Sequence, residues 1–122
     1  METIQLVKTI VQSLDTHKAQ DIRVLEVGAV SSIADYFIIA AGTSTTQVHA
    51  LVDYVDTDMG KQQIQPYRIE GYQTSLWTLM DYGSVVVHIF LDSTRDFYDL
   101  ERLWKDARPL DLAQFLEDGE KL

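Results

Sequence analysis

Apolar residues recur at helical spacing in two segments of the chain. Within residues 4–14 they fall at i, i+3, i+7 and i+10, which predicts an N-terminal helix with one buried stripe. Within residues 48–59 a similar stripe follows Ser44 and Gln47, whose spacing is that of a capping box, and it stops at Gly60. The pattern therefore predicts two amphipathic helices.

Three further segments have the composition of strands. In residues 21–27 polar and apolar side chains alternate in part, which predicts a strand with one partly solvated face. Residues 36–41 are apolar without alternation, as expected of a central strand that is covered on both sides. Residues 65–70 predict a short strand, and Pro66 near its start favours the edge of a sheet.

The apolar runs at residues 76–81 and 84–91 predict a β-hairpin. They meet at an Asp-Tyr-Gly-Ser corner, where Gly83 tolerates the positive φ that a tight turn requires. The segment that follows predicts a helix over residues 95–104, with Ser93 as its N-cap.

Together these elements predict an α/β fold with a mixed sheet of about five strands and helices on both faces. No repeat or interdomain linker interrupts the pattern. We therefore expect one domain over residues 1–108. Residues 109–122 are expected to form a C-terminal tail or a short helix.

Composition narrows the classes of function. The 122 residues contain no cysteine, which excludes disulfides and cysteine-ligated metals. Neither an apolar N-terminal run nor a cationic leader is present, so a cytoplasmic protein is expected. The net charge of -9 disfavours direct contact with nucleic acid and favours a basic protein partner, although it also serves solubility alone.

The Gly42-Thr43-Ser44 turn is the strongest candidate for enzymatic chemistry. A turn between a buried strand and a helix can bind phosphate through its backbone amides. Nucleotidyl transfer also needs paired carboxylates on the adjoining strand, whereas the nearby Asp56 and Asp58 lie two apart on a predicted helix and point to different sides. We therefore interpret the turn as structural and expect no cofactor, no metal site and no enzymatic activity.

The three histidines support that interpretation. His17, His49 and His88 are far apart, and none has a second ligand at metal-binding spacing. His88, in the middle of an apolar strand, is expected to be a hydrogen-bonded core residue.

Candidates for partner contacts gather around the hairpin. Trp77 and Asp81 share one side of the first hairpin strand, while Met80 is on the other. If helices cover the Met80 side, Trp77 is available to a partner, with Asp81 in an acidic rim that steers basic proteins. The alternative is that Trp77 belongs to the core.

Four more residues complete the set of partner candidates. Tyr82 is placed at the hairpin corner, where exposure is expected, and Tyr98 lies on the following helix. Asp35 and Tyr36 stand at the start of the central apolar segment.

Four segments in order along the chain carry a family resemblance. They are ADYF leading to GTS (residues 34–44), WxLxDYG (77–83), VVVHIF (85–90) and RxFYxLExLW (95–104). Over residues 2–106 the chain resembles the Iojap-like family, the ribosomal silencing factors of bacteria and organelles. The resemblance implies a nucleotidyltransferase-like fold without the catalytic carboxylates.

The same resemblance implies a translation repressor that needs no catalysis. Such a protein binds the large ribosomal subunit through its protein fourteen, blocks joining of the small subunit, and slows translation when nutrients are limited. Two alternatives stay open at this point: a nucleotide-binding or nucleotidyltransferase-type enzyme that uses Gly42 to Ser44, and a homodimer with a purely structural purpose.

Overall fold

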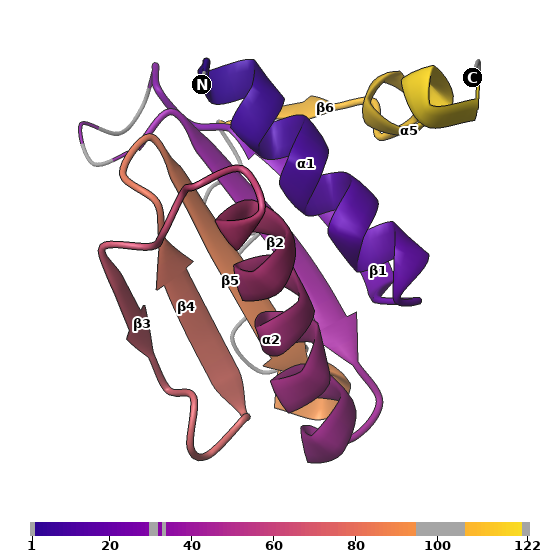
Figure 1. Cartoon of the computed structure of the whole chain (residues 1–122), viewed down its shortest axis with the longest axis vertical. Coiled ribbons are helices and arrows are strands. Elements are labelled where there is room, and N and C mark those ends of the chain that lie inside the picture. Colours follow the sequence, from indigo (N-terminus) through magenta and orange to yellow (C-terminus); the bar gives the residue numbers. More distant parts are fainter. Residues whose placement is uncertain (1, 30–31, 33, 95–106, 121–122) are drawn as a thin grey trace.

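The computed structural model describes residues 2–29, 32, 34–94 and 107–120 (Figure 1). The helix predicted over residues 95–104, which contains Tyr98, lies outside the described residues. The elements are, in chain order, α1 (Thr3–Thr16), β1 (Gln20–Glu26), β2 (Tyr36–Gly42), α2 (Thr45–Gly60), β3 (Arg68–Glu70), β4 (Trp77–Asp81), β5 (Val85–Leu91), β6 (Arg108–Leu110) and α5 (Ala113–Glu120).

The strands form one sheet in the order β3-β4-β5-β2-β1-β6. The central pair β2 and β5 is parallel, and every other pair in this sheet is antiparallel. The mixed α/β prediction is therefore confirmed, with six strands among the described residues where about five were expected.

The additional strand is β6, which pairs with β1 at one edge of the sheet. Glu26 lies opposite Arg108 and Val24 opposite Leu110. Three residues around Pro109 have no strand pattern of their own, and proline is tolerated in a strand mainly at an edge. Pairing with β1, rather than local preference, makes this segment a strand. The sequence placed a domain boundary at residue 108. Strand β6 crosses that position and α5 follows it, and the boundary itself stays a prediction.

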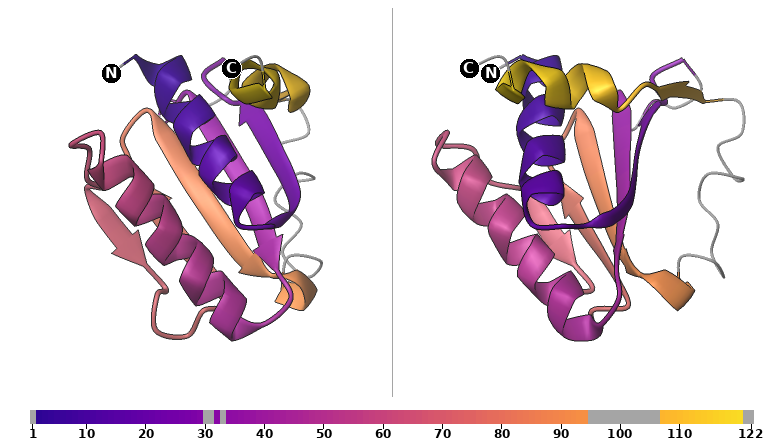
Figure 2. Two further views of the ribbon diagram at one scale, coloured as in Figure 1. Left: turned by 45° about the vertical axis from the view of Figure 1, so that its right-hand side comes forward. Right: turned by 90° about the vertical axis from the view of Figure 1, so that its right-hand side faces the viewer.

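Helices α1 and α2 lie side by side against the same face of the sheet (Figures 1 and 2). Helix α5 packs against α1, where the Gln12 side chain donates a hydrogen bond to the carbonyl of Phe115 at 3.1 Å. The helical cover predicted for the opposite face falls on residues outside the described part. No helix within the described ranges is both long and apolar enough to cross a membrane.

The predicted cap of α2 is confirmed. The Ser44 hydroxyl oxygen accepts a hydrogen bond from the Gln47 backbone N–H at 3.1 Å. The return bond of the capping box is shifted by one residue, because the Gln47 side-chain oxygen accepts from the Thr43 N–H at 2.7 Å. The helix ends at Gly60, as its apolar stripe predicts.

The core has two parts, one on each side of the sheet. The helix-face cluster lies between the sheet and helices α1 and α2, and from the central strand it receives Ile38 and Ala40. The far-face cluster lies on the opposite side and receives Phe37 and Ile39 from the same strand. This alternation confirms β2 as a strand buried on both sides. The buried members of the far-face cluster are Leu25, Val27, Ala34, Phe37, Ile39, Val86, Phe90 and Ala107, with Trp77 and Leu79 half-buried against them.

Candidate partner-binding surface

Trp77 begins β4 and is half-buried on the far face of the sheet. Its indole Nε1–H donates a hydrogen bond to Nδ1 of His88 at 3.1 Å. Its ring also stacks on Phe90, which lies opposite in the register, with 5.1 Å between ring centroids. Trp77 is thus neither fully exposed nor fully buried, and its role as a partner contact stays a prediction.

His88 is the hydrogen-bonded core histidine that the sequence predicts. Only 4% of its surface is exposed, and the Phe37 ring meets it edge-on at 4.8 Å. Burial lowers the pKa of His88 to about 4, so the ring is neutral near pH 7. A neutral ring leaves Nδ1 free to accept from Trp77.

The loop that precedes β4 fixes the backbone position of Trp77. The loop before β4 folds around the Gly71 carbonyl, which accepts hydrogen bonds from the Thr74 hydroxyl, the Ser75 N–H and the Thr78 hydroxyl at 3.2 to 3.3 Å. Gly71 has φ +79°, and a Cβ there would stand 2.1 Å from the Trp77 carbonyl oxygen. Only glycine fits this contact, which places the start of β4 against the loop.

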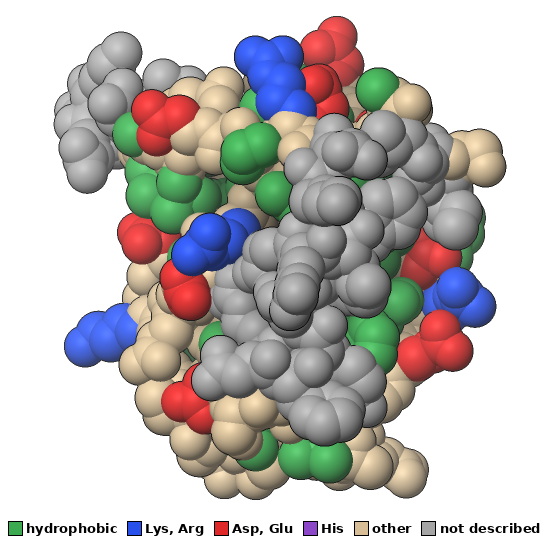
Figure 3. Space-filling model, turned by 180° about the vertical axis from the view of Figure 1, so that it is seen from behind, with side chains coloured by type: hydrophobic (Ala, Val, Ile, Leu, Met, Phe, Trp, Pro, Cys, Tyr) green, Lys and Arg blue, Asp and Glu red, His purple; other side chains and the backbone are tan. Residues whose placement is uncertain are grey.

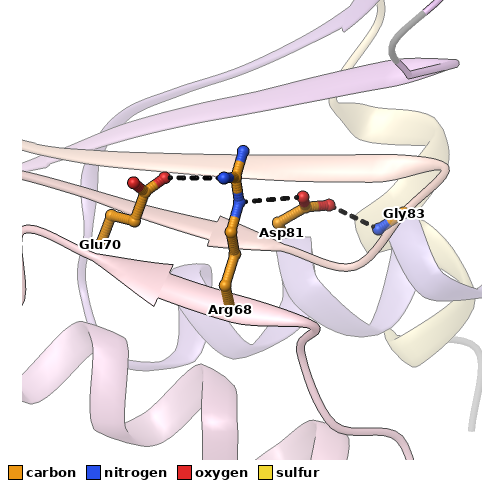
Figure 4. Close-up of polar contacts among 4 residues, drawn as sticks. All are labelled: Arg68, Glu70, Asp81 and Gly83. Atoms are coloured by element: carbon orange, nitrogen blue, oxygen red, sulfur yellow. Dashed lines mark hydrogen bonds and ion pairs between the residues drawn. The ribbon is translucent and has the colours of Figure 1, made fainter.

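Asp81 ends β4 in a small polar network (Figure 4). One carboxylate oxygen accepts from the Gly83 N–H at 2.8 Å, and the other lies 3.3 Å from Nε of Arg68. Arg68 also lies 3.5 Å from the Glu70 carboxylate. One cation is shared between two carboxylates, so this rim of the sheet keeps a negative charge. Gly83 has the positive φ expected of the corner, +87°.

The expected exposure of Tyr82 is wrong. Its side chain is 5% exposed and belongs to the helix-face cluster, and its hydroxyl has no hydrogen-bond partner among the described residues. Burial raises the pKa of Tyr82, and the charge of Asp56 adds to the shift. The corner itself is at the surface, but the strand alternation that places Met80 under the helices also directs Tyr82 inward.

The exposed aromatic at this corner is Tyr67, which sequence reasoning did not single out. Its side chain is 81% exposed, and its ring lies above Gly83, where a Cβ would come within 2.9 Å of Tyr67 Cε2. The available signal was its position just after Pro66, beside a short edge strand.

Asp35 and Tyr36 lie where β2 begins. The Asp35 side chain is exposed, and the Tyr36 hydroxyl lies 3.5 Å from a Glu26 carboxylate oxygen. Burial first, and then the charge of Glu26, raise the pKa of Tyr36. A hollow of about 430 Å³ opens beside them. It is lined by Thr3, Glu26, Gly28, Ala29, Asp35 and Tyr36.

The register shows which candidates the fold brings together. Asp81 pairs with Val86, and Tyr36 pairs with Val85. Asp81, Asp35 and Tyr36 therefore lie at the same end of the sheet, whereas Trp77 is four residues away along β4, about 13 Å at the rise of a strand.

Figure 3 shows the molecule from behind. Acidic, basic and apolar side chains are interspersed around the edge of this view.

The turn at Gly42 is built as a helix cap. The amides of Thr43 and Gln47 already donate to side chains, and the Val48 N–H donates to the Ser44 carbonyl at 3.0 Å. A phosphate held by the amides of Thr43 or Gln47 would have to displace these bonds. Over the described ranges, no three His, Asp or Glu side chains gather closely enough to hold a metal ion.

Comparisons with known proteins agree with the resemblance. A family model described as "Ribosomal silencing factor during starvation" (RsfS) matches residues 1–121. The chain is 38% identical over 112 residues to the ribosomal silencing factor RsfS of Halalkalibacterium halodurans, covering 92% of this chain and 96% of that relative. It is 34% identical over 111 residues to the chloroplastic protein Iojap of Zea mays, covering 91% of this chain and 48% of the relative.

A crystal structure of a Chromobacterium violaceum protein superimposes on this chain with a TM-score of 0.83 and 34% identity. The alignment covers 86% of this chain and 88% of that one. The resemblance carried by the four sequence signatures is thus confirmed in both sequence and fold. The chain belongs to the RsfS family, the ribosomal silencing factors during starvation.

Proposed function

We propose that this protein binds the large ribosomal subunit through its protein fourteen and prevents the small subunit from joining, which represses translation when nutrients are limited. Membership of the RsfS family across residues 1–121 carries the proposal. The family consists of ribosome-associated regulatory proteins rather than enzymes. A protein that acts on ribosomes works where they are, so we place it in the cytoplasm.

Charge supports a basic ribosomal protein as the partner. The chain carries a net charge of -9, and its acidic side chains include Asp35 and Asp81 at one end of the sheet and Glu70 on the edge strand β3. Such a surface raises the association rate with a basic partner and repels the RNA around it. Protein-mediated attachment therefore suits this chain better than direct contact with nucleic acid.

The proposed contacts are Trp77, Asp81, Asp35 and Tyr36, with Tyr98 on the segment outside the described residues. A half-buried tryptophan beside a carboxylate rim has the character of an interface anchor. Tyr82 is retained in a different role, as a support of the hairpin corner from the helix side.

Steric exclusion requires only differential binding. A protein that occupies the joining face of the free large subunit, and cannot reach that face in the joined ribosome, shifts the equilibrium toward separate subunits by mass action. No chemical step is needed.

Order of addition on sucrose gradients tests the proposal. Protein premixed with separated subunits should reduce the joined peak, and the same protein added after joining should have little early effect. Inhibition should weaken as salt rises, because screening slows association. Equal early loss in both orders would indicate active splitting, and no loss in either would reject exclusion.

Contact residues are tested by cosedimentation with large subunits. Trp77→Ala should weaken binding by more than about 1 to 2 kcal/mol, as interface aromatics do, while His49→Ala on α2 should not. Light scattering of the same samples measures whether the protein is a monomer or the homodimer that its aromatic content permits. A folded Trp77→Ala variant that binds like the parent would remove this face from the proposed contact.

A further inference from the structure

We infer that His88 is a positioning residue: by accepting the indole hydrogen bond, it holds the Trp77 ring in the orientation in which it meets the ribosome. The inference rests on the proposed function, because Trp77 acts there as a partner contact. His88 itself is 4% exposed and acts only through Trp77.

Two contacts within the described residues restrict the indole ring. Phe90 stacks on it at an interplanar angle of 22°, which limits its tilt. Stacking alone is compatible with a flip of the indole about χ2, because the flipped ring would stay parallel to Phe90 and the described neighbours on the far face are mostly apolar. The bond of 3.1 Å from Nε1 to His88 Nδ1 selects one of those orientations.

The chemistry of the pair allows one arrangement of protons. The indole N–H can only donate, so Nδ1 of His88 must be the acceptor and Nε2 must carry the proton. That Nε2 is buried and has no hydrogen-bond partner among the described residues. An unpaired buried donor is destabilising, and an aliphatic side chain at this position would avoid it. The acceptor at Nδ1 is what histidine provides here and leucine does not.

The backbone supports the same interpretation. The loop around the Gly71 carbonyl fixes where β4 starts, and therefore where the Trp77 Cα lies. His88 lies two residues before Phe90 on β5, diagonally across from Trp77 and directly opposite Leu79. The Cα position and the ring orientation of Trp77 are thus set by different parts of the chain, and an ordered aromatic loses less entropy on binding.

Two substitutions at one position separate the acceptor from the ring. His88→Asn keeps an acceptor oxygen close to the position of Nδ1, and His88→Leu removes it, while both remove the imidazole. The indole N–H resonances of ¹⁵N-labelled protein report the bond without any ribosome, and Trp77→Phe identifies the resonance that belongs to Trp77. We expect His88→Leu to shift this resonance and speed its exchange with solvent, and His88→Asn to preserve it.

Binding to purified large subunits is measured for the same folded variants. We expect His88→Leu to weaken binding roughly two- to tenfold, the range for one hydrogen bond between neutral groups, and His88→Asn to restore most of it. In a Trp77→Phe background, which lacks the donor, His88→Leu should have no further effect.

Equal weakening by His88→Leu and His88→Asn, or an undiminished effect of His88→Leu in the Trp77→Phe background, would overturn the inference. So would a Trp77→Ala variant that binds like the parent, although ribosome binding itself would then stand. A parent protein that does not bind large subunits would instead reject the proposed function, and the indole resonances would still decide whether His88 orients Trp77.

Discussion

The two faces of the sheet are built from different kinds of side chain. The helix-face cluster is mainly aliphatic, and residues such as Ile10, Leu51 and Val87 are 0 to 1% exposed. The far-face cluster combines aliphatic residues with the aromatic group of Phe37, Phe90 and Trp77, into which the buried His88 inserts. Close packing of aliphatic groups contributes chiefly to stability, whereas amphipathic aromatics with polar atoms also suit recognition.

Two aromatic residues of the hairpin make the contrast concrete. Trp77 and Tyr82 are five positions apart, and because side chains alternate along a strand, an odd separation places them on opposite faces. Trp77 is half-buried on the far face with its N–H paired, while Tyr82 is buried on the helix face with its hydroxyl unpaired among the described residues. Their aromatic character alone does not tell which of the two residues is buried under the helices. Their odd or even position along the strand does.

The strongest test of this division is a cavity on the helix face. Leu51→Ala should lower the free energy of unfolding by about 2 to 5 kcal/mol, because Leu51 is 1% exposed and its removal leaves a void. Urea denaturation measures the loss. Tyr54→Ala on the same helix, at a side chain that is 45% exposed, is the matched control and should cost much less. Binding of the folded Leu51→Ala fraction to large subunits should match the parent; a large loss would show that the two faces are not separate in function.

The far face should respond to acid. The pKa of His88 is about 4 in the folded protein, below its ordinary value of 6.5, so the unfolded chain takes up a proton first as the pH falls. The contribution of His88 to stability is therefore complete above pH 6.5 and is lost between pH 6.5 and about 4, by about 3 kcal/mol in all.

Denaturation of the parent and of His88→Leu at several pH values isolates this contribution. Carboxylates titrate in both proteins, so the difference between the two curves reports His88. The difference should change across that window and be constant above it; curves that stay parallel from pH 7 to pH 4 would contradict the buried neutral ring.

A substitution at Tyr82 should change the free energy of unfolding by less, and in the stabilising direction. Tyr82→Phe removes a buried hydroxyl that has no partner among the described residues, so stability should be unchanged or rise by up to about 1 kcal/mol. Thermal unfolding measures the sign, and binding to large subunits should not change. If this variant binds weakly while remaining fully stable, the Tyr82 hydroxyl reaches the partner and its place on the helix face is not its whole role.

The smallest expected effect on stability is at the rim. Arg68 is 61% exposed in its side chain and pairs with Glu70 and Asp81, so Arg68→Ala should cost less than about 1 kcal/mol. It also leaves two carboxylates without their shared cation, which should speed association with a basic partner at low salt. Stopped-flow association at two salt concentrations measures this, with Lys61→Ala as the control on the helix side. Slower association after Arg68→Ala would place a carboxylate of the partner here.

Most elements follow from local pattern because each depends on its own residues. The stripe of α1, the cap and end of α2 at Ser44 and Gly60, and the turn at Gly83 all meet requirements that a few neighbouring side chains satisfy. The family resemblance could be recognised from the sequence for the same reason, since each of its four signatures is a continuous segment of the chain.

Other features depend on contacts between residues far apart in the sequence, so the local pattern of apolar and polar residues could not predict them. Strand β6 exists because β1 offers an unpaired edge, and the orientation of Trp77 depends on His88, eleven residues away on a neighbouring strand. Exposure of Tyr67 and burial of Tyr82 at one corner follow from which side of the sheet the helices cover. Burial and hydrogen-bond partners are properties of surfaces that form only when strands and helices pack, so they are decided by the tertiary structure.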